Sequence, residues 1–98
     1  MQIPKQITVG KKTYAVERPK IIQDPPSYGR ISFTMNRIQI AQGDSHGNKF
    51  DKDDLANTFW HELTHAILHD MGHDLCDNER FVTAFANRLS DAVNSAKL

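Results

Sequence analysis

The 98-residue sequence predicts an α+β fold, in which a small antiparallel sheet of three to four strands precedes two packed helices. In the first half, apolar residues alternate with polar ones between turns that contain Gly, Pro or Asn, as in half-buried strands. In the second half, apolar residues recur every three or four positions over two segments without Gly or Pro, as on the buried face of a helix. We expect one domain, residues 1–98, with a single modest core.

The predicted strands form two hairpins. The first covers residues 6–17 and turns at Gly10. A loop at residues 19–26 contains three prolines, which are excluded from central strands because they cannot donate to the ladder. The second hairpin covers residues 29–41 and turns at residues 34–36. The alternating apolar residues are Ile7, Val9, Tyr14, Val16, Ile31, Phe33, Ile38 and Ile40.

The first helix is predicted over residues 54–69. Asp51 and Asp54 are spaced as in a capping box, in which the two residues accept hydrogen bonds from each other's backbone N–H. Gly72 favours an end shortly after the helix, because glycine readily adopts the left-handed conformation found there. The predicted buried stripe comprises Leu55, Phe59, Leu63, Ala66 and Ile67.

This helix carries the motif His61-Glu62-Leu63-Thr64-His65. Side chains four residues apart share one face of a helix, so both imidazoles can reach one Zn²⁺ ion with bonds of about 2.0–2.1 Å. Glu62 leaves the helix beside them, where its carboxylate can take a proton from water at the metal. We therefore expect His61 and His65 to be metal ligands and Glu62 to be the general base. The alternative is a surface helix that carries these residues on its exposed face.

A tetrahedral catalytic zinc site needs a third protein ligand. Glu79 begins a second predicted helix, residues 79–93, which Asp77 or Asn78 would cap. If this helix packs antiparallel on the first, its first turn returns to the motif, and Glu79 becomes the expected ligand. The alternatives are His73 as the ligand and Glu79 as an ordinary acid favoured by the helix dipole. The apolar stripe of this helix comprises Phe81, Val82, Phe85, Ala86, Leu89 and Val93.

The H-E-x-x-H motif followed by a Glu at the start of the next helix resembles the gluzincins, a group of zinc metallopeptidases. The chain looks most like the small ImmA/IrrE-type metallopeptidase domains of bacteria and their phages. The resemblance covers about residues 28–93, and only H-E-x-x-H is specific. It implies a zincin-like fold and hydrolysis of peptide bonds, with zinc held by His61, His65 and Glu79 and with Glu62 as the general base.

The same resemblance implies further roles. Thermolysin-like members carry an Asp that orients a zinc-bound His, where this chain has Thr83. Either another acid, Asp53 or Asp91, orients the His here, or the site is looser than theirs. A strand edge, either residues 37–42 or the strand paired with them, would bind the extended backbone of a protein or peptide substrate. The candidates for stabilising the oxyanion are His69, His46, His73 and Tyr28.

Two other functions remain open from the sequence. Residues 65–75 are similar to the three-His signature of bacterial endoribonucleases that mature ribosomal RNA, but Leu75 stands where their third His is found and His73 comes two residues early. The chain would then be a zinc-dependent endoribonuclease. Alternatively, it is a protein-binding module that keeps the scaffold, with or without metal, and does not catalyse.

The composition predicts a cytoplasmic protein without a nucleic-acid or membrane partner. Twelve basic residues balance 12 acidic ones, which argues against binding to a polyanion. Cys76 is the single cysteine, so no disulfide framework is expected, and it is interpreted as a small buried hydrophobe. The first residues lack the apolar segment of a secretory signal, and no apolar run approaches the length of a membrane span.

Overall fold

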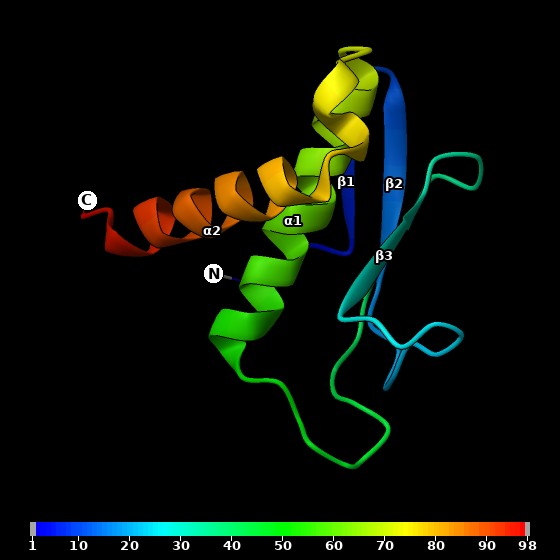
Figure 1. Ribbon diagram of the computed structural model, residues 1–98, viewed down its shortest axis with the longest axis vertical. Coiled ribbons are helices and arrows are strands. Elements are labelled where there is room, and N and C mark those ends of the chain that lie inside the picture. Colours follow the sequence, from blue (N-terminus) through cyan, green and yellow to red (C-terminus); the bar gives the residue numbers. More distant parts are fainter. Residues whose placement is uncertain (1, 98) are drawn as a thin grey trace.

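The computed structural model describes residues 2–97 and has the predicted order of four strands followed by two α-helices (Figure 1). The strands are β1 (Gln6–Val9), β2 (Lys12–Glu17), β3 (Gly29–Ser32) and β4 (Arg37–Ile40). The helices are α1 (Lys52–Asp70), a short 3₁₀ helix η1 (Asp74–Asp77) and α2 (Glu79–Ser95). The predicted α+β class is therefore confirmed.

The sheet is mixed, whereas the sequence predicted antiparallel pairing throughout. Its order is β1-β2-β4-β3, with two antiparallel hairpins joined by parallel pairing between β2 and β4. The chain does not place β3 directly beside β2. Instead, β4 lies between β2 and β3 in the sheet. Alternation of apolar residues specifies which face of a strand is buried but not which strand lies beside it. As a result, β4 is central and β3 is an edge strand.

Helix α1 packs on one face of the sheet and forms the main core with it. Phe59, Leu63 and Ala66 of α1 are buried against apolar side chains of the strands. Ile67, which was also predicted to be buried, is 42% exposed. It lies about a quarter turn around the helix from Phe59 and Ala66, which places it away from the sheet. The strand residues of this core are Tyr14, Val16, Ile38 and Ile40.

Both α-helices have side-chain caps at their N-termini. The Asp51 carboxylate accepts a hydrogen bond from the backbone N–H of Asp54 at 2.9 Å, and Asp54 accepts one from the N–H of Asp51 at 3.4 Å. The predicted capping box is therefore confirmed. At the start of α2 the cap is Asn78, whose Oδ1 accepts from the N–H of Phe81 at 2.9 Å. Gly72 has a positive φ of 63° just after α1, as predicted.

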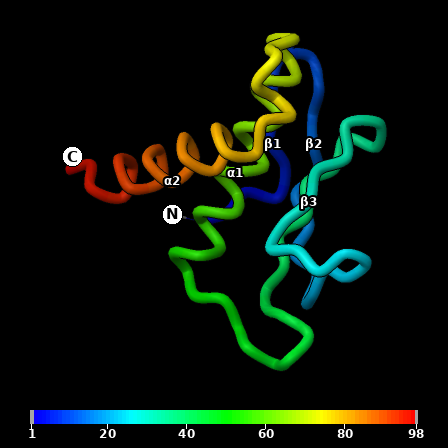
Figure 2. The backbone as a smooth tube through the Cα atoms, in the orientation of Figure 1, coloured from blue at the N-terminus to red at the C-terminus, as the bar shows by residue number. Residues whose placement is uncertain are grey.

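Helix α2 crosses α1 steeply, whereas the sequence predicted antiparallel packing along its length (Figure 1). The C-terminal half of α2 projects away from the rest of the chain, as the trace in Figure 2 also shows. Val82 and Ala86 are fully buried, whereas Phe85 and Val93 of the same predicted stripe are 47% and 40% exposed. The predicted stripe of α2 is therefore only partly buried, although Ser90 in the second half of the helix is also buried. Within residues 2–97, no helix has the length and hydropathy of a membrane span.

Candidate metal centre

His61, His65 and Glu79 converge where the first turn of α2 meets α1. Their ligand atoms all lie within 4.8 Å of one another. Oε2 of Glu79 is 3.1 Å from Nε2 of His61, and its Oε1 is 2.8 Å from Nε2 of His65. Neighbouring ligand atoms of a tetrahedral zinc ion are separated by about 3.3 Å, which is close to these distances. The three residues predicted as ligands thus form a His/His/Glu group that could bind a metal ion.

The third member of this group is Glu79, and not the alternative His73. Asn78 caps α2 and begins the helix at Glu79, so the carboxylate leaves the first turn, beside the motif on α1. His73 is engaged elsewhere, because its Nδ1 accepts a hydrogen bond from the N–H of Leu75 at 3.1 Å and caps η1. Among the described residues, no metal-binding group includes His73.

The position of His65 is set by a main-chain contact from η1. Its Nδ1 donates a hydrogen bond to the carbonyl oxygen of Cys76 at 2.7 Å, so a neutral ring presents a lone pair at Nε2. That lone pair faces a Glu79 carboxylate oxygen, and two acceptors this close need a proton or a cation between them. A metal ion meets this need, and the Cys76 carbonyl would orient its ligand. In residues 2–97, neither Asp53 nor Asp91 forms a hydrogen bond or ion pair with these histidines, so that prediction was wrong.

Burial suits His61 and Glu62 to their predicted roles. Loss of solvent lowers the pKa of His61, an effect partly offset by the Glu79 carboxylate, and this favours the neutral ring that binds metals. Burial, together with the charge of Glu79, raises the pKa of Glu62 to about 8. A bound cation would favour the carboxylate form and lower this pKa. Glu62 is therefore able to exchange a proton near neutral pH.

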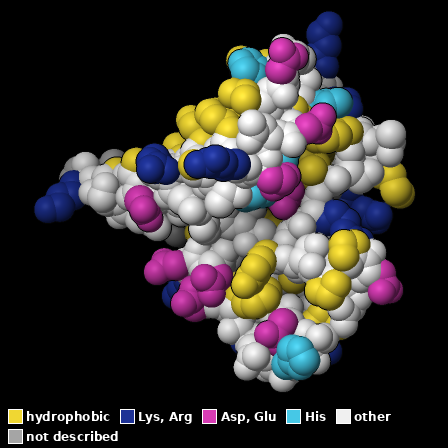
Figure 3. All heavy atoms as spheres, viewed as in Figure 1, with side chains coloured by type: hydrophobic (Ala, Val, Ile, Leu, Met, Phe, Trp, Pro, Cys, Tyr) yellow, Lys and Arg dark blue, Asp and Glu magenta, His cyan; other side chains and the backbone are white. Residues whose placement is uncertain are grey.

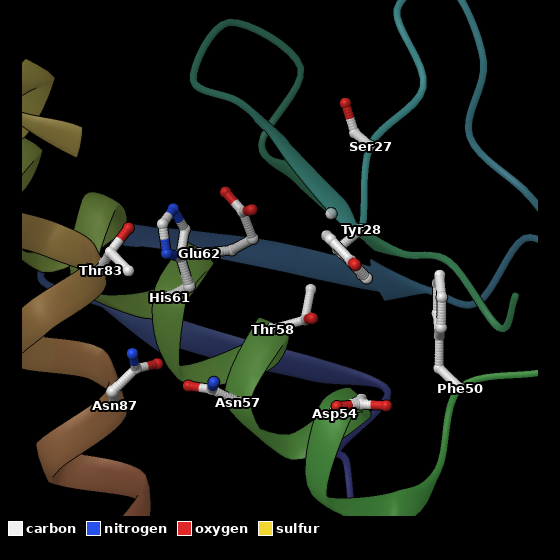
Figure 4. Close-up of a pocket in the computed structure, with 11 residues that line it drawn as sticks. Ser27, Tyr28, Phe50, Asp54, Asn57, Thr58, His61, Glu62, Thr83 and Asn87 are labelled. Carbon is white, nitrogen blue, oxygen red and sulfur yellow. The ribbon is translucent and has the colours of Figure 1, made fainter. Parts of the chain in front are cut away.

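A cavity of about 570 Å³ opens beside His61 and Glu62 (Figure 4). One wall is the start of β3 with the residues before it, and the other walls come from α1, the first half of α2 and Phe50. The lining residues are Ser27, Tyr28, Gly29, Phe50, Asp54, Asn57, Thr58, His61, Glu62, Thr83 and Asn87. The motif therefore borders a space large enough to receive part of a ligand.

The strand at this cavity is β3, because β4 lies inside the sheet between β2 and β3. Of the two strands that the sequence left open, the partner of residues 37–42 is thus the edge. Gly29 brings this strand very close to α1: a Cβ atom there would lie 2.5 Å from Cγ2 of Thr58 and 2.9 Å from Oε2 of Glu62. Glycine is therefore required for β3 to approach the Glu62 carboxyl this closely.

Of the four residues predicted as oxyanion donors, Tyr28 alone lines the cavity with Glu62. His69 stacks on Phe33 with ring centroids 3.9 Å apart, and His73 caps η1. His46 lines a second cavity, and Tyr28 is among the residues that line it too. His65, His69 and His73 are thus not gathered into one group in the described part of the chain, which gives no support to the endoribonuclease reading.

Several site features were not predicted from the sequence. The Cys76 carbonyl has no signature, because any residue type supplies one, although burial of the Cys76 side chain was predicted and is confirmed. The close approach at Gly29 could have been predicted, since a glycine in a strand often marks close approach of another group. Asn57 and Asn87 line the cavity without any recognisable spacing between them.

Comparisons of this chain with protein-family models, with curated proteins and with solved structures found no match. The functional argument therefore rests on the arrangement of its own side chains.

Metal binding is expected to stabilise the fold. A ligand present at about 1,000 times its Kd stabilises the native state by about 4 kcal/mol, so excess Zn²⁺ should raise the Tm of metal-free protein by at least about 5 °C. Calorimetry with and without Zn²⁺ measures the shift. His61→Ala should abolish it, whereas His46→Ala, in an exposed loop, should retain it. An equal shift in His61→Ala would place the bound zinc elsewhere.

Proposed function

We propose that this chain is a gluzincin-like zinc metallopeptidase, in which His61, His65 and Glu79 hold Zn²⁺ and Glu62 is the general base. The observation that carries the proposal is the Glu62 carboxyl, which lies next to the His/His/Glu group in a cavity bordered by an edge strand. Two imidazoles and one carboxylate form a catalytic zinc set that leaves a position for water or substrate. We also propose a cytoplasmic location, which suits the free thiol of Cys76.

Different groups of the chain would carry out different steps of hydrolysis. A zinc ion, when bound, lowers the pKa of water and polarises the carbonyl of the substrate. Glu62 accepts the proton of the attacking water and delivers it to the departing amine. Backbone groups on the free edge of β3 pair with the extended backbone of a protein or peptide, and Gly29 holds that edge against Glu62. Tyr28 supplies a hydroxyl donor for the developing oxyanion.

Zinc content and hydrolysis test the proposal together. Protein purified without tags or chelators should contain about one zinc per chain. It should cleave an unfolded protein substrate, lose this activity in a chelator and recover it when Zn²⁺ is restored. Protein that binds no zinc even when it is offered would show that His61 and His65 are not ligands, and the peptidase proposal would fail.

Gly29→Ala is expected to reduce kcat by about 10-fold or more while zinc remains bound. The added methyl group meets Thr58 and Glu62, and a displacement of about 1 Å at a catalytic site can cost about 10²-fold in rate. Steady-state kinetics and zinc analysis measure the two effects separately.

The nearest atom to that methyl group is Cγ2 of Thr58, which provides a rescue test. Thr58→Ser removes this atom and keeps the hydroxyl, so the double variant Gly29→Ala, Thr58→Ser should recover part of the lost activity. Full activity in Gly29→Ala would mean that the close approach of β3 does not matter for turnover.

A further inference from the structure

The cavity at the candidate metal centre continues along α1 towards the first turn of that helix. Asp54, Thr58 and Glu62 are four residues apart, so they share one face of α1, and all three line the cavity (Figure 4). Asp54 lies about 12 Å along the helix axis from Glu62. The cavity therefore has a reactive end at Glu62 and a far end at Asp54.

The far end combines a carboxylate with two aromatic rings. The rings of Tyr28 and Phe50 are in contact, with centroids 4.8 Å apart and planes tilted by 42°. Figure 4 shows the Asp54 carboxylate on the side of the cavity where Phe50 lies. In the space-filling view of Figure 3, hydrophobic and acidic side chains also lie next to each other over this part of the surface.

The far end of the cavity carries the charge of Asp54. No Lys or Arg is among the described residues that line the cavity. Arg30, next to Gly29, is engaged in a loop, where it donates to the carbonyl oxygens of Gln23 and Pro25 at 2.9 and 3.2 Å. Within residues 2–97, the Asp54 carboxylate accepts one hydrogen bond, the 3.4 Å capping contact from Asp51. It therefore has acceptor capacity for a ligand.

We propose that this far end is a subsite for a basic side chain, lysine or arginine, of a peptide bound along β3. The inference rests on the proposed peptidase function and specifies its substrate class. Asp54 supplies the ion pair and charge-assisted hydrogen bonds, and the rings of Tyr28 and Phe50 attract the cation. An acidic substrate side chain would instead meet the Asp54 carboxylate and is disfavoured.

The subsite can be measured by binding, independently of turnover. The probes are short neutral peptides in which a single lysine is moved through each position, with norleucine as the uncharged counterpart. Zinc-loaded Glu62→Gln protein is used, so that the peptides are not consumed, and calorimetry gives Kd. At one position, lysine should bind about 3-fold or more tightly than norleucine; the effect is modest because the Asp54 carboxylate is exposed to solvent.

Two matched variants in the Glu62→Gln background assign the preference to Asp54. Asp54→Asn removes the charge, yet its side-chain oxygen can still accept the capping hydrogen bond from Asp51. In this variant, the ratio of the Kd for the norleucine peptide to the Kd for the lysine peptide should fall to nearly one. Asp53→Asn removes the same charge from the same helical turn outside the cavity lining, and should keep the preference.

The outcomes separate this proposal from the peptidase itself. Parental protein that hydrolyses peptides, with no lysine preference at any position or with a preference that survives Asp54→Asn, would overturn the subsite and leave the peptidase. A lysine preference that depends on Asp54, in a chain that hydrolyses nothing, would support the subsite and overturn the peptidase. Failure to bind any of the peptides would overturn the subsite as well.

Discussion

Glu62→Gln should lower kcat/KM for peptide hydrolysis by at least about 10²-fold and leave the zinc content unchanged. The amide has nearly the shape of the carboxylate, so the buried site keeps its packing, but it cannot take the proton from water. The proposed metal ligands His61, His65 and Glu79 are untouched by the change. Kinetics with a peptide substrate and elemental analysis of the same preparation measure both quantities.

Glu17→Gln is the matched control, because Glu17 lies on β2 and outside the cavity lining. It should hydrolyse peptides at the parental rate. If Glu62→Gln also did so, Glu62 would not be the base. If the parental chain bound zinc but hydrolysed no peptide, the edge of β3 would instead serve a protein-binding module.

Glu79→Ala should weaken zinc binding by about 10-fold or more, because it removes the proposed third ligand. The Glu79 side chain is 67% exposed, so its loss should change the fold little, and the effect can be read as a loss of metal affinity. Competition with a chromophoric chelator gives the dissociation constant.

Asp77→Ala provides the comparison for this experiment. Asp77 is an acid two residues before Glu79, in η1 and outside the His/His/Glu group. Zinc affinity should be unchanged in this variant. Undiminished affinity in Glu79→Ala would assign the third ligand to another residue. His73 would then be the first residue to substitute and test for zinc affinity.

The helices and their ends could be predicted because the information is local. The capping box of Asp51 and Asp54 and the stop at Gly72 depend on residues within one helical turn of each end. The same holds for the His61 and His65 pair, since any α-helix places positions four apart on one face. Glu79 was within reach of sequence analysis because a short connection follows α1 and a cap fixes where α2 begins.

The positions of strands and helices relative to one another could not be predicted in this way. Apolar alternation was correct for both hairpins, yet it carries no information about the parallel pairing of β2 and β4. Similarly, Val82 and Ala86 of the α2 stripe are buried as predicted, but the crossing with α1 leaves Phe85 and Val93 of the same stripe exposed. The acid expected to orient a histidine was wrong, because the main chain at Cys76 does this work.

From the sequence alone, the strands and both α-helices could be predicted, but the 3₁₀ helix η1 could not. The sequence also placed His61, Glu62 and His65 on one helix, and favoured Glu79 over His73 as the third member of the group. Tertiary structure decided that β3 is the edge, that Gly29 brings this edge against Glu62, and that Asp54 shares a cavity with Tyr28 and Phe50. The reason is physical. Helix geometry relates residues a few positions apart in the same way in every protein, whereas contacts between distant segments depend on how the whole chain packs its core.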